Sequence, residues 1–334
     1  MSVAKKIAFN TAISVSARML GMVFALVGIA FAARYLGPEG FGEYSTILAF
    51  LFIFSIIADF GLQQIMVREI SKPDADEAKI VGNIFGLKMA AAAVIFTVAV
   101  IAIYFFPYSE NVKKGVLIVA AANFFGSLIQ LLSGVFQKHL RTDRMAVAEI
   151  TARLVQTGLI IFFVYADFGF LPIVATITVS NLLNFLMIFR FAKKFVNFKT
   201  ATDFDFWKKT LKMSLPIGIS ALFTLVYFKF NIIILSLLKT QTEVGLFSAA
   251  FKVLETSVFI PAMFVGLVMP FFSKYAVFDR QMFARYFQRS FDVISIIALP
   301  IVFGGIFFSN EIMGLLGGEN FLEASAALKI IMLA

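Results

Sequence analysis

Basic side chains occur inside long apolar segments of this sequence, where a charged group is costly. On insertion scales, a charge at the centre of a membrane-spanning helix costs about 2.5–3.5 kcal/mol. Arginine and lysine also bind phosphate oxygens through strong, charge-assisted hydrogen bonds. Such cations could therefore line a hydrated cavity and bind an anionic substrate. The candidates are Arg18, Lys88, Arg153, Lys229 and Lys252.

Uncharged polar residues recur at helical spacing in the same segments. Asn123 and Gln130 lie on one predicted helix face, and Gln156 follows Arg153 by three residues. A similar stripe contains Arg18, and another consists of Ser248, Lys252 and Glu255. Hydrogen bonding inside a helical bundle would use one or two such stripes, whereas four favour a water-filled cavity. Close helix packing explains the glycines and alanines beside Arg18, but it does not explain Arg18 itself.

Acidic residues in or near the apolar segments could pair with these cations or take part in ion coupling. Glu149 precedes Arg153 by four residues and Glu255 follows Lys252 by three, spacings that allow ion pairs on one helix. Local pairing is therefore an alternative to substrate binding. Snorkelling to the membrane interface is the alternative for Arg18 and Lys88. The full set of candidate coupling residues is Asp59, Glu149, Glu255 and Asp292.

The sequence lacks the patterns that an enzyme or a metal centre would need. It has no cysteine and a single histidine, His139, which excludes thiolate chemistry and multi-histidine metal sites. A Walker-type phosphate-binding loop is missing from it too, so we expect no ATP hydrolysis by this chain. We predict a protein that is not an enzyme and that uses no cofactor and no metal.

The elements that must position these residues are long apolar helices. Of the 334 residues, 60% are hydrophobic and 15% are charged, against about 45–50% and about 25% in soluble domains. Each apolar run reaches the roughly 20 residues that a helix needs to cross a bilayer. The sequence predicts an all-α polytopic membrane protein, with a tenth apolar stretch opening near Ala324. The nine complete predicted spans are 11–33, 44–67, 80–106, 115–138, 146–166, 170–191, 213–237, 245–272 and 284–308.

The net charge of +9 follows a membrane topology and does not indicate a nucleic-acid partner. With the N-terminus in the cytoplasm, 19 lysines and arginines fall in cytoplasmic connections and four in outer ones. This bias is the positive-inside rule. We expect a multi-pass protein of the cytoplasmic membrane, surrounded by membrane lipids. Its longest polar connection, rich in lysine and phenylalanine, is a plain linker or a segment that binds anionic lipid.

A short internal repeat divides the chain into two halves. Residues 42–45 (Gly-Glu-Tyr-Ser) match residues 245–248 (Gly-Leu-Phe-Ser) at an offset of 203. Six spans separate the two matches, so both units enter the membrane from the same side, as in parallel transporter repeats. We predict two pseudo-symmetric bundles of six helices each, the second incomplete in this chain. The predicted domains are a first bundle at 1–192, a cytoplasmic linker at 193–212 and a truncated second bundle at 213–334.

Residues 34–45, Arg-Tyr-Leu-Gly-Pro-Glu-Gly-Phe-Gly-Glu-Tyr-Ser, resemble the signature of the polysaccharide-biosynthesis flippases. These are the O-antigen-type lipid-linked oligosaccharide flippases of the multidrug/oligosaccharidyl-lipid/polysaccharide exporter superfamily. Leu215-Pro216, residues 244–250 and Met269-Pro270 agree with the second half of that family. The glycines and proline of the first motif suit a turn between two antiparallel helices. The motif therefore identifies the family, and we do not expect it to contact the substrate.

The resemblance implies a secondary transporter that flips an anionic lipid-linked oligosaccharide to the outer leaflet by alternating access. Its substrate would be a lipid-linked glycan, and polysaccharide-assembly enzymes would be its partners. A cation-coupled multidrug antiporter of the same superfamily is the alternative, and it would favour intramembrane carboxylates over cations. A membrane glycosyltransferase or polymerase would need an acidic metal motif on a sizeable extramembrane domain, and this sequence shows neither.

Overall fold

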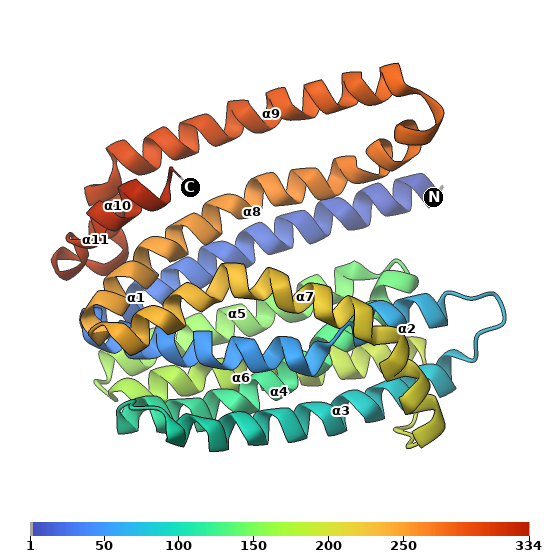
Figure 1. Ribbon diagram of the computed structural model, residues 1–334, viewed down its shortest axis with the longest axis horizontal. Coiled ribbons are helices and arrows are strands. Elements are labelled where there is room, and N and C mark those ends of the chain that lie inside the picture. Colours follow the sequence, from blue (N-terminus) through green and yellow to red (C-terminus); the bar gives the residue numbers. More distant parts are fainter. Residues whose placement is uncertain (1–2, 334) are drawn as a thin grey trace.

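The protein is a bundle of long helices (Figure 1). The computed structural model describes the backbone of residues 3–333, and the side chains of 19–220, 230–258, 279–333 and part of 259–278. Within the described residues, six helical stretches are long and apolar enough to cross a membrane. The all-α, multi-pass fold predicted from the sequence is confirmed. The helices are α1 (Val3–Asp59), α2 (Leu62–Ile70), α3 (Glu77–Ala102), η1 (Ile103–Phe105), α4 (Glu110–Lys138), α5 (Thr142–Tyr165), α6 (Phe170–Phe195), α7 (Phe204–Leu238), α8 (Gln241–Phe278), α9 (Arg280–Phe307), α10 (Ser309–Gly317), η2 (Glu319–Phe321) and α11 (Ala324–Ile331).

The long helices run back and forth between two ends of the molecule (Figure 1). The end that we call the linker end holds the start of α1, the connections 71–76 and 139–141, the segment 196–203 and the turn between α8 and α9. The opposite end, which we call the kink end, holds Gly37 and the connections 103–109, 166–169 and 239–240. Polar caps start several helices: Ser109 caps α4 and Asp203 caps α7.

At the start of α8, Thr240 and Glu243 form a reciprocal capping box. Such a box satisfies N–H groups that have no partner within their own helix. The backbone N–H of Thr240 also holds the pKa of the Glu243 carboxyl below its ordinary value. The kink-end turn before α8 is therefore fixed by the chain's own polar groups.

α1 consists of two membrane helices joined at the kink end. Gly37 has φ 65° and ψ 179°, a conformation outside the helical region, and Pro38 follows it. Glycine adopts a positive φ without strain, and proline fits the first position of a helix. The turn predicted from the glycines and proline of the signature is thus present at this point.

The second predicted span, 44–67, is not one continuous helix. It breaks at Phe60 and Gly61, which have φ values of 43° and 78°, and resumes as α2. A Cβ atom on Gly61 would lie 2.8 Å from the side chain of Ile217, and one on Gly218 would lie 2.6 Å from the Phe60 ring. The apolar pattern hides this break because apolar residues, including the buried Ala58 and Leu62, continue on both sides of it. Its position is set by the contact with α7.

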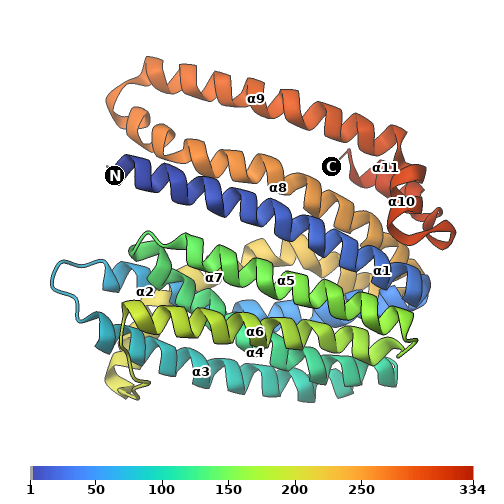
Figure 2. The same cartoon turned by 180° about the vertical axis from the view of Figure 1, so that it is seen from behind.

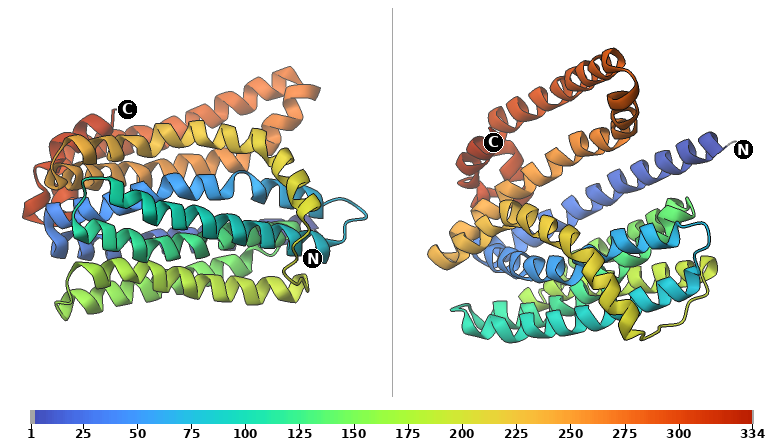
Figure 3. Two further views of the ribbon diagram at one scale, coloured as in Figure 1. Left: turned by 60° about the horizontal axis from the view of Figure 1, so that its bottom comes forward. Right: turned by 45° about the vertical axis from the view of Figure 1, so that its right-hand side comes forward.

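Helices α1 to α6 carry the first six predicted spans, and we refer to them together as the first bundle. One part of its core joins α2, α3, α4 and α6 around Phe136, and another joins the second half of α1 to α3 and α4. In the second half of the chain, α8, α10 and α11 share a core to which Phe41 of α1 contributes. The first half of α1 lies between α5 and α8, and α9 lies farthest from the first bundle (Figures 2 and 3).

The extended part of the predicted linker is residues 196–203, which we call the strap. The strap crosses α3, where the Ala201 N–H donates to the Gly82 carbonyl oxygen at 3.2 Å. The Trp207 indole N–H donates to the Asn83 carbonyl oxygen at 2.9 Å, and Phe198 is buried in the first bundle's core. The connection between the two halves is therefore docked on the first bundle.

Candidate functional site

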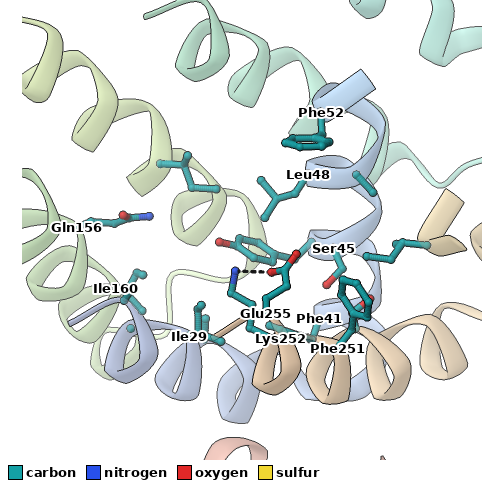
Figure 4. Close-up of a pocket in the computed structure, with 18 of the residues that line it drawn as sticks. Ile29, Phe41, Ser45, Leu48, Phe52, Gln156, Ile160, Phe251, Lys252 and Glu255 are labelled. Carbon is teal, nitrogen blue, oxygen red and sulfur yellow. Dashed lines mark hydrogen bonds and ion pairs between the residues drawn. The ribbon is translucent and has the colours of Figure 1, made fainter. Parts of the chain in front are cut away.

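A cavity of about 420 Å³ lies among six helices drawn from both halves of the chain. α1, α4, α5 and α6 of the first bundle contribute most of its wall, and α7 and α8 contribute the rest. Its lining combines apolar and aromatic side chains with a large share of polar and charged ones. Figure 4 shows Gln156 on one side of the cavity and Ser45, Lys252 and Glu255 on the other.

The α8 side of the cavity carries a paired charge. Lys252 donates from Nζ to Glu255 Oε2 at 3.1 Å, the i,i+3 pairing that the sequence allows. This pair is the dashed contact in Figure 4. Because the lysine and the glutamate are adjacent, this side of the cavity offers a dipole and not a bare cation.

The α5 side carries a cation with a neutral partner. Arg153 donates from Nη1 to Gln156 Oε1 at 3.2 Å, and its stem passes Gly21 of α1. The side chains of Glu149 and Arg153 are both described, and no ion pair joins them, although their i,i+4 spacing would allow one. Asn123, a predicted site residue, also lines this cavity. Among the described residues of the lining, Lys252 is paired with Glu255, whereas Arg153 forms no ion pair with a carboxylate.

Other predicted site residues lie elsewhere. Lys88 is fully buried in the first bundle, where its Nζ lies 2.7 Å from Asp59 Oδ1, and it does not line the cavity. Gln130 is exposed on α4 outside the cavity lining. Asp292 on α9 accepts a hydrogen bond from Gln288 at 2.8 Å. The side chains of Arg18 and Lys229 lie outside the described residues, so their cavity role stays a prediction.

The two halves of the chain line the cavity with equivalent positions of the repeat. At the offset of 203, Ser45 corresponds to Ser248, Leu48 to Phe251, Ala49 to Lys252 and Phe52 to Glu255, and all eight residues line the cavity. Sequence reasoning found the repeat but missed Ser45, Leu48 and Phe52 as site residues. Applying the repeat offset to the predicted stripe of Ser248, Lys252 and Glu255 finds Ser45 and Phe52, together with Ala49, whereas Leu48 corresponds to Phe251, which that stripe does not contain.

A close crossing of the two halves closes the cavity toward the kink end. A Cβ atom on Gly42 would lie 1.8 Å from the Gln241 carbonyl oxygen, and one on Gly245 would lie 1.8 Å from that of Pro38. The contact is reciprocal, because Gln241 and Pro38 are also 203 residues apart. Only glycine permits backbones to approach this closely. Thr46 adds a hydrogen bond to Gln241 Oε1 at 3.1 Å.

The signature at residues 34–45 holds the kink end together. Arg34 donates to the carbonyl oxygens of Gly314 at 3.4 Å and Leu315 at 2.7 Å in α10. The Tyr35 hydroxyl lies 2.5 Å from Asp167 Oδ1, and Glu43 accepts a hydrogen bond from Ser109. These contacts reach α10 and the two connections 166–169 and 103–109, so the first part of the signature has a structural role. Its last residues, Phe41, Tyr44 and Ser45, line the cavity, which differs from the expectation that the motif lies away from the substrate.

A family model described as "polysaccharide biosynthesis protein" matches residues 7–276. The chain belongs to the polysaccharide biosynthesis protein family. Membership accounts for the signature and for the second-half motifs, because the match runs through both. It also places the repeated cavity lining, from Ser45 to Glu255, inside the matched region.

Two curated relatives of this family member are transport proteins by name. One is the "probable low-salt glycan biosynthesis flippase Agl15" of Haloferax volcanii, 24% identical over 324 residues, which cover 94% of this chain and 66% of the relative. The other is the "putative O-antigen transporter" of Shigella flexneri, 22% identical over 314 residues, covering 90% and 74%. The chain thus spans just under two thirds of the archaeal relative's length. Both names describe transporters and not enzymes, in agreement with the prediction.

Solved structures share the fold. A multidrug resistance MATE family transporter of the MOP superfamily in its inward-facing conformation superposes with a TM-score of 0.72 at 14% identity, covering 96% of this chain and 79% of that one. The lipid II flippase MurJ, in an inward closed conformation, superposes with a TM-score of 0.70 at 16% identity, covering 98% and 72%. At these identities the likeness establishes the fold of this family member and leaves its substrate open.

Proposed function

We propose that this protein flips an anionic, lipid-linked oligosaccharide across the cytoplasmic membrane for cell-surface polysaccharide biosynthesis. The observation that carries the proposal is Arg153, a cation without a carboxylate ion-pair partner among the described residues, facing a cavity between the two halves. A phosphate or diphosphate linking lipid to sugar would supply the missing negative charge, since arginine binds phosphate through two parallel hydrogen bonds. The flippase and O-antigen transporter names of the relatives support this substrate class.

Alternating access is the mechanism we propose for the transport. The Gly42–Gly245 crossing and the Arg34 hydrogen bonds to α10 join the two halves at the kink end. Opening the cavity to the outside would break these contacts, and the two halves would have to approach each other toward the linker end. In this proposal the N-terminus and the strap lie in the cytoplasm, where the enzymes that assemble the glycan would deliver it.

A cation-coupled multidrug antiporter is the second candidate, favoured by the likeness to a multidrug transporter of the MATE family. A cationic drug would need a carboxylate that is available to it in the cavity. The cavity's carboxylate, Glu255, is already paired with Lys252, and Arg153 would repel a cation. These charges favour the flippase.

The test is a flipping assay with the purified chain in liposomes. The probe is a fluorescent polyprenyl diphosphate that carries one hexose, and its accessibility to a membrane-impermeant quencher reports flipping. Arg153→Gln removes the charge and keeps the hydrogen-bonding capacity, and we expect it to reduce the flipping rate at least tenfold. Arg144→Gln, on the same helix but outside the cavity lining, is the matched control and should flip normally. Equal rates for both variants would contradict the proposal, and proton-driven efflux of a cationic dye by the wild type would favour the antiporter.

A further inference from the structure

The closed end of the cavity carries two serines that occupy equivalent positions in the two halves. Ser45 of α1 and Ser248 of α8 are both buried and both line the cavity. Each lies three residues after a glycine of the Gly42–Gly245 crossing, which is roughly 4.5 Å along a helix. The two hydroxyls therefore flank the pseudo-symmetry axis at the cavity floor, defined here by Tyr44, Ser45, Ser248 and Phe251.

Ser248 has an unsatisfied hydroxyl. The side chain is 6% exposed, and its Oγ has no hydrogen-bond partner among the residues that the structure describes. Leaving a buried polar group unpaired costs about 1–3 kcal/mol, so most such groups in proteins have a partner. Serine hydroxyls in helices usually bond to the preceding turn, as Ser257 does to the Val253 carbonyl oxygen at 2.9 Å. Ser248 lines the cavity with this oxygen just beneath the cavity surface, and rotation to another staggered χ1 rotamer would present the hydroxyl to a bound molecule.

The charges around the floor disfavour an anion there. The Glu255 carboxylate, two turns further along α8, would repel a phosphate, and its partner Lys252 is already neutralised by it. Arg153 is placed differently. Arg153 lies twelve residues from the end of α5 at the kink end, which is roughly 18 Å along the helix. Ser248 lies seven residues from the start of α8 at the same end, which is roughly 10 Å. The positive charge therefore sits nearer the linker end and the hydroxyls nearer the kink end.

From this arrangement we infer that the cavity floor is a neutral sugar subsite, in which Ser248 and Ser45 hydrogen-bond the hydroxyl groups of a glycan while Arg153 holds the phosphate. This inference rests on the proposed function. A hydroxyl both donates and accepts, so it matches a sugar hydroxyl in either sense. Tyr44 and Phe251 supply the aromatic part of the floor. A volume of about 420 Å³ is within the range for sites that bind small molecules, so the floor receives the sugar next to the phosphate and not a whole long glycan.

The experiment separates the sugar from the phosphate with two radiolabelled lipids. One is a polyprenyl phosphate, and the other is the same lipid phosphate bearing a single glucose. Binding of each to the full chain in lipid nanodiscs is measured for the wild type and for Ser248→Ala. We expect Ser248→Ala to weaken binding of the glucosylated lipid about fivefold to tenfold, the loss of one hydrogen bond, and to leave binding of the bare phosphate unchanged. Ser248→Thr, which keeps the hydroxyl, should bind both lipids like the wild type.

Ser309→Ala is the matched control. Ser309 is another fully buried serine whose hydroxyl has no partner among the described residues, but it lies at the start of α10, outside the cavity lining. The control should bind both lipids normally. Equal weakening of both lipids by Ser248→Ala would mean that the serine binds the phosphate, and no weakening would mean that it binds neither; each result overturns the sugar subsite. Arg153→Gln should weaken both lipids, and a wild type that binds neither lipid would overturn the proposed function as well.

Discussion

Lys88 and Asp59 form an ion pair inside the first bundle. The lysine side chain is 0% exposed and that of Asp59 is 13% exposed, with 2.7 Å between Nζ and Oδ1. The pair joins α3 to the residue that precedes the break at Phe60 and Gly61. The pair therefore has a structural role, because it fixes the end of α1 against α3.

Removing one member of this pair should destabilise the protein more than removing both. Lys88→Met or Asp59→Asn alone leaves a buried charge without its partner, which typically costs about 3–5 kcal/mol. The double variant Lys88→Met/Asp59→Asn leaves no buried charge and should recover most of the lost stability. Thermal unfolding of the detergent-solubilised protein, followed by size-exclusion chromatography, measures this. Single variants as stable as the wild type would argue against a structural pair.

The strap packs closely against α3 at Gly82, which has no side chain. A Cβ atom on Gly82 would lie 2.1 Å from the Lys199 carbonyl oxygen. Gly82→Ala should therefore push the strap away and cost about 1–3 kcal/mol, the usual range for overpacking a core. Gly158→Ala on α5 is the control, because a Cβ there would meet no atom within 4 Å and alanine favours a helix. The measurement is the melting temperature of each variant. A Gly82→Ala variant that melts at the wild-type temperature would show that the strap can move away from α3 at little cost.

The membrane-spanning helices could be predicted because the lipid environment constrains the sequence directly. Each span shows as an apolar run, because lipid solvates its outer face. The break at Phe60–Gly61 was not predictable, because Ile217 and Gly218, which specify it, are about 155 residues away in the chain. Lys88 was assigned to the cavity because its partner Asp59 lies on another helix. Lys252 and Glu255 were placed together correctly, since their spacing on one helix fixes their distance.

The strap should face the cytoplasm in the assembled membrane protein. Thr202 is exposed in the strap, and the chain contains no cysteine. A cysteine introduced by Thr202→Cys should therefore resist a membrane-impermeant thiol reagent in intact cells and react after the cells are opened. Lys114→Cys, exposed at the start of α4 near the kink end, should show the reverse pattern. Ready labelling of residue 202 in intact cells would overturn the proposed orientation.

Arg34 links the two halves at the kink end through two carbonyl oxygens of α10. Both hydrogen bonds leave from Nη2. Arg34→Lys keeps the charge but replaces the planar guanidinium with a shorter side chain that ends in an ammonium group, so it should weaken both bonds and favour states in which the kink end is open. Spin labels on cysteines at Lys114 and Glu311, both exposed near this end, would report the distance between the halves. We expect Arg34→Lys to show a larger population of long distances between the labels. An unchanged distance distribution would mean that Arg34 does not help to close the kink end.

The reciprocal crossing of Gly42 and Gly245 bears on how the two halves can diverge. If both halves descend from one duplicated unit, each glycine on the axis packs against the copy of its own neighbourhood. A larger residue on either side would collide with backbone, so drift at these positions is blocked in both copies. Ala49 and Lys252 lie off the axis and are free of that restriction. On such a descent, the crossing would keep the symmetry of the original unit, whereas the cavity beside it could acquire different side chains in the two halves, as at Ala49 and Lys252.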